Sequence, residues 1–209
     1  LVALWLSNLA LGPFRNYDTG LYHLASVSWA KQHPIIPGLG NLHGRLAFNS
    51  STFLYAAMVD AVPSMGASQG FALGLLLLVL MAQALLSLYR VLSRTSIRPC
   101  CDLFGSLLLV PMLFLQLGNI PSISPDLTVF VLGIAISQHL CLFLQREDWS
   151  HAETKFDIFV ITILAGVGVT VKLNFLFLGL PAVLTAAVVW YRRMRRLSAI
   201  DRLKTLLLL

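Results

Sequence analysis

Long apolar runs alternate with short polar stretches along this chain, in the pattern typical of a protein that crosses a membrane several times. The runs that predict single membrane-crossing helices are 71–89, 103–118 and 126–145. Residues 1–12 form a shorter run, which we interpret as the end of a first span. Pro111 lies inside one run and predicts a kink there, because proline removes a helical hydrogen bond.

A fourth run, 156–191, is too long for one crossing and too short for two full crossings with a loop. The polar triplet Lys172-Leu173-Asn174 interrupts it near the middle. We therefore predict two short or tilted helices, 156–171 and 175–191, that meet at this break.

The longest polar segment, 13–70, is predicted to be a loop that carries helices lying at the membrane interface. Apolar positions between Gly20 and Gln32 predict a short amphipathic helix that starts at Asp18. A second helix is expected at 52–62, lying along the interface without crossing.

Two arginine clusters give the orientation, since cytoplasmic segments are rich in Lys and Arg. The clusters are Arg90, Arg94 and Arg98, and then Arg192, Arg193, Arg195 and Arg196. Counting the predicted spans between them returns the chain to the same side, as the rule requires. The loop 13–70, the turn 119–126 and the break at Lys172 then all face away from the cytoplasm.

Composition agrees with this topology. The chain is 57% hydrophobic and 11% charged, whereas a soluble domain has about 25% charged residues. The net charge of +6 does not indicate nucleic-acid binding, because the arginines lie beside apolar runs. The expected fold class is an all-α polytopic transmembrane helix bundle, an integral multi-pass membrane protein with one domain over 1–209.

The ends and the cysteines add little about function. The chain starts at a Leu and stops in an apolar segment, 205–209, so we expect a fragment of a longer protein with a cytoplasmic basic segment at 192–204. The three cysteines, Cys100, Cys101 and Cys141, show no metal-binding spacing and are interpreted as small apolar residues or lipidation targets.

Polar residues of the loop have structural and functional interpretations. Asp18 is either the N-cap of its helix, which the local sequence favours, or a catalytic acid or base. Arg45 suits a phosphate group or a lipid headgroup. His43 shares no ligand spacing with the other histidines and so does not predict a metal site. Asn49 begins a glycosylation-type triplet.

Two further charged residues lie outside the loop. Asp126 follows Ser124-Pro125 at the start of a span, where an acidic residue is a normal N-cap. Lys172 within an apolar run either reaches the interface with its amine or faces a cavity or partner, and we favour the second interpretation.

Four segments together resemble the GT-C superfamily of membrane glycosyltransferases: "YDTGLYH", "PGLGNLHGRLAFNSS", "SPDL" and "GVTVKLNFLFLGLP". The outer loop is closest to a group of bacterial multi-spanning proteins within that class. The resemblance covers about residues 13–191 and implies a GT-C-like bundle, a bacterial inner-membrane location, and transfer of a sugar from a polyprenyl-phosphate-linked donor.

The resemblance also implies roles for individual residues. Asp18 corresponds to the loop carboxylate that acts as base on the acceptor hydroxyl, although the loop has a single acid rather than a paired acidic motif. Asp126 would orient the acceptor or hold a divalent metal where one is used. Arg45 and Lys172 would offset the negative charge of the departing phosphate. This inference rests on their positive charge and on the side of the membrane where they are predicted to lie.

His43 and Asn49 complete the substrate-binding candidates. The expected partners are the lipid-linked donor and membrane lipids, and the sequence does not predict an oligomeric state. Two alternatives stay open: a transporter or flippase, with Asp126 and Lys172 in its substrate path, and a membrane scaffold in which the acids are helix caps.

Overall fold

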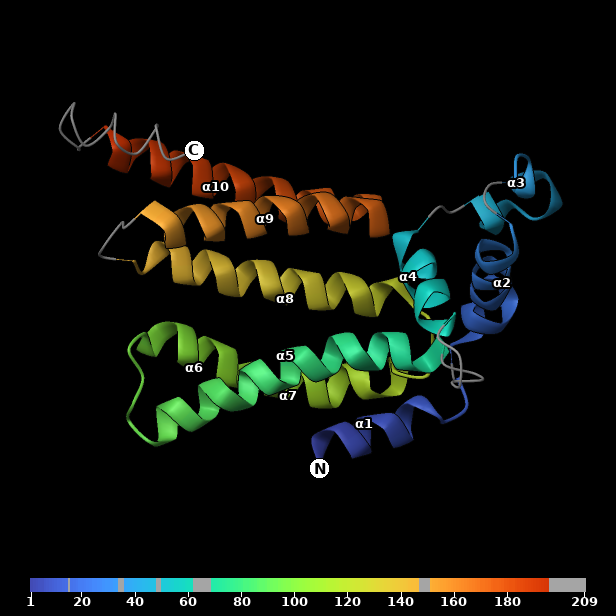
Figure 1. Cartoon of the computed structure of the whole chain (residues 1–209), viewed down its shortest axis with the longest axis horizontal. Helices are drawn as coiled ribbons and strands as arrows, with labels where there is room; N and C mark the ends of the chain where they lie inside the picture. The colour runs from blue at the N-terminus through green and yellow to red at the C-terminus, as the bar shows by residue number, and fades with distance from the viewer. Residues whose placement is uncertain (15, 34–35, 48–49, 62–68, 147–150, 196–209) are drawn as a thin grey trace.

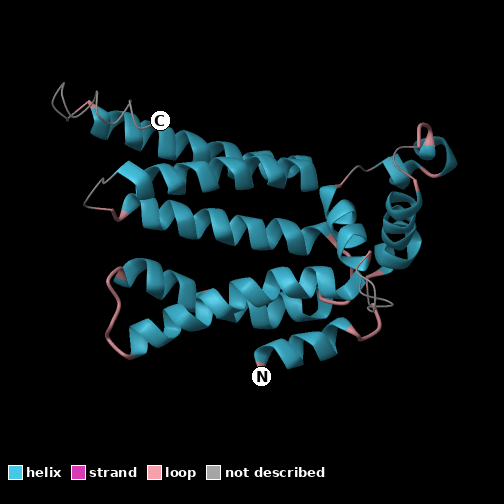
Figure 2. Ribbon diagram, in the orientation of Figure 1, coloured by secondary structure: helices cyan, strands magenta, loops and turns pink. Residues whose placement is uncertain are grey.

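The computed structural model describes residues 1–14, 16–33, 36–47, 50–61, 69–146 and 151–195. Within these ranges the chain forms helices and turns and contains no strand (Figure 2). Long helices lie side by side, and the short helices between residues 19 and 60 cluster at one end of them (Figure 1). The predicted all-α architecture is confirmed.

Four described helices are long and apolar enough to cross a membrane. They are α5 (Gln69–Leu92), α8 (Pro125–Leu144), α9 (His151–Val171) and α10 (Leu176–Met194). Their apolar stretches are 18 to 23 residues long, close to the length that spans the hydrocarbon core of a bilayer. The chain is therefore a multi-pass membrane protein by the length and composition of its helices.

The run 156–191 forms two antiparallel helices, as predicted, but each is longer than expected. The stretches Thr154–Val171 and Leu173–Met194 are each long enough to cross a bilayer. Lys172 adopts an extended conformation between them, and a 3-10 turn, η5 (Leu173–Phe175), starts the return. The polar break is thus the turn between two spans rather than a defect inside one span.

The run 103–118 differs from the single kinked span that was predicted. The structure has α6 (Pro99–Leu107), the short α7 (Leu109–Pro111) and a π-helix, η3 (Met112–Gln116). The break falls at Leu108, three residues before Pro111. A proline has no N–H for the carbonyl one turn earlier, so the helix is interrupted before the ring.

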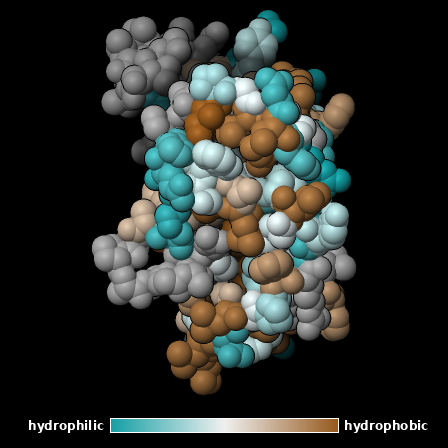
Figure 3. Space-filling model, turned by 90° about the vertical axis from the view of Figure 1, so that its right-hand side faces the viewer, coloured by the Kyte–Doolittle hydropathy of each residue, from teal (hydrophilic) through white to brown (hydrophobic). Residues whose placement is uncertain are grey.

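The outer loop forms short helices, together with α1 (Val2–Ala10) before it. They are η1 (Thr19–His23), α2 (Leu24–Gln32), α3 (Leu39–Leu42), η2 (Gly44–Ala47) and α4 (Ser51–Asp60). Both α2 and α4 run across the ends of the long helices (Figure 1), which is the direction expected of interfacial helices. Polar and apolar residues intermix on this end of the molecule (Figure 3).

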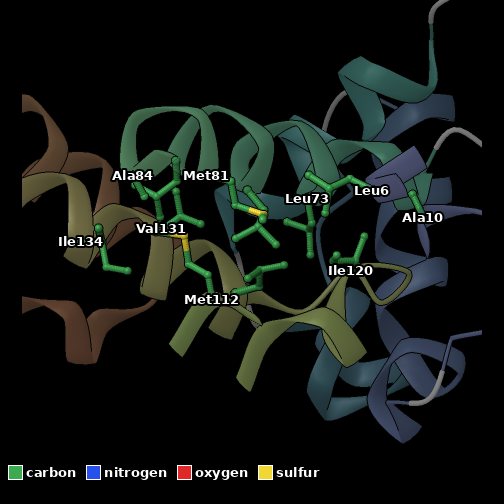
Figure 4. Packing of buried hydrophobic residues seen from close by; sticks show 12 residues of the cluster. Leu6, Ala10, Leu73, Met81, Ala84, Met112, Ile120, Val131 and Ile134 are labelled. Carbon is green, nitrogen blue, oxygen red and sulfur yellow. The ribbon is translucent and has the colours of Figure 1, made fainter. Parts of the chain in front are cut away.

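Three apolar clusters hold the helices together. One joins α1, α5, η3 and α8 through residues such as Leu6, Leu73, Met112 and Val131 (Figure 4). Another packs α8 against α9 and α10. The third, here called the outer cluster, joins η1 and α2 to α4 and contains Tyr22, Val27, Phe53, Ala56, Ala57, Ala72 and Ile123. Because Ala72 lies in α5, the outer cluster fixes the short helices on the bundle.

Arginines of both clusters lie at the opposite end of the bundle from α2 and α4. Arg90 is 3.7 Å from Asp102 at the start of α6, and Arg193 donates to the Arg146 carbonyl at 2.9 Å. The ends of α5 and α10 are therefore at one end of the bundle (Figure 1), which is the arrangement that the positive-inside rule demands.

Candidate functional site

Four predicted site residues, from separate parts of the chain, lie at the bundle end that carries the short helices. Asp18 precedes η1 and Arg45 lies in η2. Asp126 lies in the first turn of α8, and Lys172 lies in the turn between α9 and α10. Asn49, the remaining loop candidate besides His43, falls outside the described residues.

The N-cap interpretation of Asp18 is wrong. Its backbone is already helical, with φ −64° and ψ −24°, and its side chain makes no capping hydrogen bond. Asn16 does the capping instead, because its Oδ1 accepts the backbone N–H of Asp18 at 2.9 Å. The Asp18 carboxylate is left to accept a charge-assisted hydrogen bond from Nη1 of Arg45.

Arg45 is held in place by contacts on both its side chain and its backbone. Its guanidinium lies over the Tyr22 ring, 5.7 Å from the centroid, and Tyr22 packs edge-on against Phe53 in the outer cluster. The backbone N–H of Arg45 donates to Nδ1 of His43 at 3.3 Å. His43 therefore shapes the turn that presents Arg45, and this is the contact the structure gives it.

The second ion pair joins α8 to the α9–α10 turn. Nζ of Lys172 donates to Oδ1 of Asp126 at 2.5 Å. The cap interpretation of Asp126 is wrong for the same reason as that of Asp18, because Oγ of Ser124 accepts the Asp126 N–H at 3.3 Å and caps α8. Both side chains are substantially exposed, 69% for Asp126 and 44% for Lys172, so they can reach a ligand from outside.

His23 is the residue of this site that the sequence analysis missed, because it did not distinguish His23 from the other histidines. It is 2% exposed, its Nδ1 lies 3.3 Å from Oγ1 of Thr19, and its ring packs beside Tyr22 and Phe53. Burial lowers the pKa of His23, although the negative charge of Asp18 opposes the shift. The imidazole is consequently neutral near pH 7.

Tyr22 and His23 both respond to charges from each of the two ion pairs. Burial raises the pKa of Tyr22, with smaller effects from Asp18, Arg45 and Asp126 in that order. His23 responds to the same three charges. Both carboxylates and Arg45 therefore act on this pair of buried rings, and Lys172 is tied to the same end of the bundle through its ion pair with Asp126. The sequence did contain one signal for His23. It lies four residues after Thr19, on the apolar side of the helix, where the two side chains can meet.

A divalent metal does not fit this arrangement well. Each carboxylate is already engaged by a cation. In the part of the chain that the structure describes, no three His, Cys, Asp or Glu side chains come together as a metal-binding group. Mg²⁺ is commonly held by one or two carboxylates plus substrate phosphates, so a metal here would share each carboxylate with Arg45 or Lys172.

An open hollow of about 440 Å³ lies on the helical turn that contains Asp18. Its lining consists of Phe14, Asn16, Tyr17, Gly20 and Leu21. Aromatic side chains on an exposed interfacial turn suit contact with lipid chains or with the apolar face of a sugar ring.

Comparison with known proteins places the chain in one family. All of it, residues 1–209, matches the family described as Domain of unknown function (DUF8201), so the chain belongs to that family. No curated protein and no solved structure matches it.

Proposed function

We propose that this protein transfers a sugar from a polyprenyl-phosphate-linked donor to an acceptor at the extracytoplasmic side of a bacterial inner membrane, and that its bundle is GT-C-like. The observation that supports the proposal is the presence of two ion pairs, Asp18–Arg45 and Asp126–Lys172, at one end of the bundle, with charges from both pairs acting on Tyr22 and His23. Such a transfer needs a base for the acceptor hydroxyl and positive charge for the departing phosphate, and both kinds of group are present.

Asp18 is the base in this proposal. Its side chain is 40% exposed, so an acceptor hydroxyl can approach it. Arg45 holds it while no phosphate is bound, and a phosphate can compete for the guanidinium through two parallel hydrogen bonds. Donor binding would then draw Arg45 toward the phosphate and free Asp18 to accept the proton.

Lys172 and Asp126 complete the site from the bundle side. The amine of Lys172 is a compact positive charge, suited to the phosphate oxygen on which negative charge develops as the sugar leaves. Asp126, released from that pair, can accept a hydrogen bond from an acceptor hydroxyl and fix its direction. His43 contributes indirectly by shaping the Arg45 turn.

The location of the site supports a lipid-linked donor rather than a nucleotide sugar. The arginine clusters predict that the site faces away from the cytoplasm, where nucleotide sugars are made. A polyprenyl carrier can deliver its sugar within the plane of the membrane, and the interfacial helices α2 and α4 lie across the bundle end where it would arrive. The hollow beside Asp18 offers a surface for the carrier chain or the acceptor.

The transporter alternative finds no support at the Asp126–Lys172 pair, although the segment from α6 to η3 is interrupted at Leu108. A transport path near the middle of the membrane is typically built from helices broken within the bilayer. The break at Lys172 lies instead between two full-length helices. The ion pair with Asp126 is therefore at the bundle end and not midway along a span.

Lipid analysis of the purified protein tests the proposal. The full-length protein would be isolated in native membrane particles, and its lipids compared by mass spectrometry with those of an unrelated multi-pass protein from the same membrane. We expect a polyprenyl phosphate or its sugar conjugate to be enriched. Recovery of bulk phospholipid alone, with no transfer of sugar from any polyprenyl-phosphate donor supplied, would overturn it.

A further inference from the structure

Two cysteines meet at the arginine-rich end of the bundle, far from the site described above. Sγ of Cys101 in α6 lies 2.9 Å from Sγ of Cys141 in α8, although 40 residues separate them in the sequence. Cys101 is buried, and its thiol also lies 3.2 Å from Oε1 of Gln145. The two helices thus present their thiols directly to each other.

Close packing keeps α6 in this position. Gly105 lies one turn after Cys101, and a Cβ there would come within 2.8 Å of Oγ of Ser87 and 3.4 Å of Nε2 of Gln138. Glycine therefore allows α6 to approach both α5 and α8 at this level. Both thiols are free in the structure, and closing 2.9 Å to a disulfide bond of about 2.05 Å needs a shift of less than 1 Å.

The geometry points to Cys101 and Cys141 as a reversible disulfide site that cross-links α6 to α8. The oxidant we name is a small disulfide of the glutathione type. One cysteine thiolate attacks it, forming a mixed disulfide and releasing one thiol. The other cysteine then attacks the protein sulfur of the mixed disulfide and releases the second thiol. Two protein thiols are oxidised to one disulfide, and the small disulfide is reduced to two thiols.

Cys100 serves as an internal control for this assignment. It is exposed, whereas its neighbour Cys101 is buried against α8. A reagent in solution reaches Cys100 most easily, yet only Cys101 faces Cys141. If exposure alone decided which thiol reacts, the oxidant would modify Cys100. If the proposed pairing decides it, the bond would form between Cys101 and Cys141.

Cross-linking would anchor the most irregular part of the bundle. The helical segment that begins with α6 is broken at Leu108 and continues as a π-helix. A bond to α8 would restrain it without touching the outer site, which lies at the other end of α8. If this end faces the cytoplasm, as the arginines predict, the bond would be transient and would respond to redox conditions.

Chemical cleavage at methionine tests the link directly. Cyanogen bromide cuts after Met112, which separates fragment 82–112, with Cys101, from fragment 113–194, with Cys141. The purified protein would be incubated with oxidised glutathione or with dithiothreitol, its free thiols blocked with N-ethylmaleimide, and the cleaved fragments run on a non-reducing gel. We expect the fragments to stay joined after oxidation and to separate after reduction.

Three variants complete the test. The fragments of oxidised Cys100→Ser should stay joined, whereas those of Cys101→Ser and Cys141→Ser should separate. Elution as a single species in size-exclusion chromatography verifies that each variant is folded, and the oxidised wild type should melt at a higher temperature than the reduced protein. Separate fragments from the oxidised wild type would overturn the inference, and so would a link lost in Cys100→Ser but kept in Cys101→Ser. Neither outcome bears on sugar transfer.

Discussion

Gly168 is the position at which the structure predicts the sharpest response to a single added methyl group. A Cβ there would lie 2.0 Å from Cδ1 and 2.2 Å from Cε1 of Phe175. That ring is 2% exposed and belongs to the cluster between α8, α9 and α10. Phe175 also ends the turn that begins at Lys172, so its packing helps to position one of the site's two cations.

The expected cost of Gly168→Ala follows from these contacts. The ring is enclosed and cannot move freely, so overpacking of this kind costs about 1–3 kcal/mol in unfolding free energy. The close approach to ring atoms places this site toward the upper end. Alanine returns up to about 1 kcal/mol through its better helix propensity. We expect a net loss of about 2 kcal/mol.

Gly166 provides a matched control on the same helix. A Cβ at Gly166 would meet no atom within 4 Å beyond its chain neighbours and its own helix backbone, so Gly166→Ala keeps only the favourable propensity term of at most about 1 kcal/mol. Unfolding of each purified variant in mixed micelles, titrated with sodium dodecyl sulfate and followed by circular dichroism, gives the two free energies. Equal stability of the two variants would refute the packing argument.

A double-mutant cycle distinguishes the clash from other effects. Phe175→Leu makes the side chain smaller and more adaptable, so Gly168→Ala should cost at least about 1 kcal/mol less in that background. If the cost of the added methyl group were the same with Leu and Phe, the Phe175 ring would not be its cause.

Three other predictions concern the outer site. Asp18→Asn should slow transfer by about 10²–10⁴-fold. It should lower the free energy of unfolding by no more than about 1 kcal/mol, because the lost ion pair is half-exposed. Asp60→Asn, at the same end of the bundle, should keep the wild-type rate, and an unchanged rate in Asp18→Asn would show that Asp18 is not the base. Ser124→Ala removes the N-cap of α8 and should lower the free energy of unfolding by about 0.5–2 kcal/mol, measured in the dodecyl sulfate titration. An unchanged free energy would contradict the assignment of Ser124 as the cap. Burial lowers the pKa of His23, so in mild acid the unfolded chain binds a proton that the folded chain does not. Stability should therefore fall as the pH drops below about 6.5. If a His23→Gln variant lost stability over the same pH range, the titration of His23 would not be the cause.

The features that sequence reasoning predicted were those encoded locally. Apolar runs give the positions of α5 and α8, because a lipid-facing helix must be apolar along its whole length. The polar triplet at Lys172 was sufficient to divide 156–191 into two helices. The local sequence did not show that each helix extends to a full membrane span, so both were predicted to be shorter than they are.

The capping assignments show why local patterns were insufficient elsewhere. Asn16 and Asp18 are both good cap residues two positions apart, and so are Ser124 and Asp126. In both places the first residue caps the helix and the carboxylate pairs with a cation distant in the chain. The choice depends on where that cation lies after folding, which no local pattern records.

His23 and the cysteine pair were missed for a related reason. A histidine followed by apolar residues has the same local sequence whether it is buried beneath a site or exposed in a loop. Its neutral state follows from burial against Phe53, which is 30 residues away. The contact of Cys101 with Cys141 exists only because α6 and α8 pack side by side, so the sequence alone allowed the cysteines to be interpreted as small apolar residues or lipidation targets.

The outer site is built across two packing units, and this has a mechanistic consequence. The Asp18–Arg45 pair lies on the outer cluster, whereas the Asp126–Lys172 pair belongs to the rim of the bundle. Helix α4 connects the units, through Phe53 on one side and through a 2.9 Å hydrogen bond from Thr170 to Ser51 on the other. The packing of α4 therefore helps to set the separation of the two ion pairs. In the proposed transfer both cations act on one phosphate, so the packing of α4 would influence the transfer rate although it supplies no charge to the site.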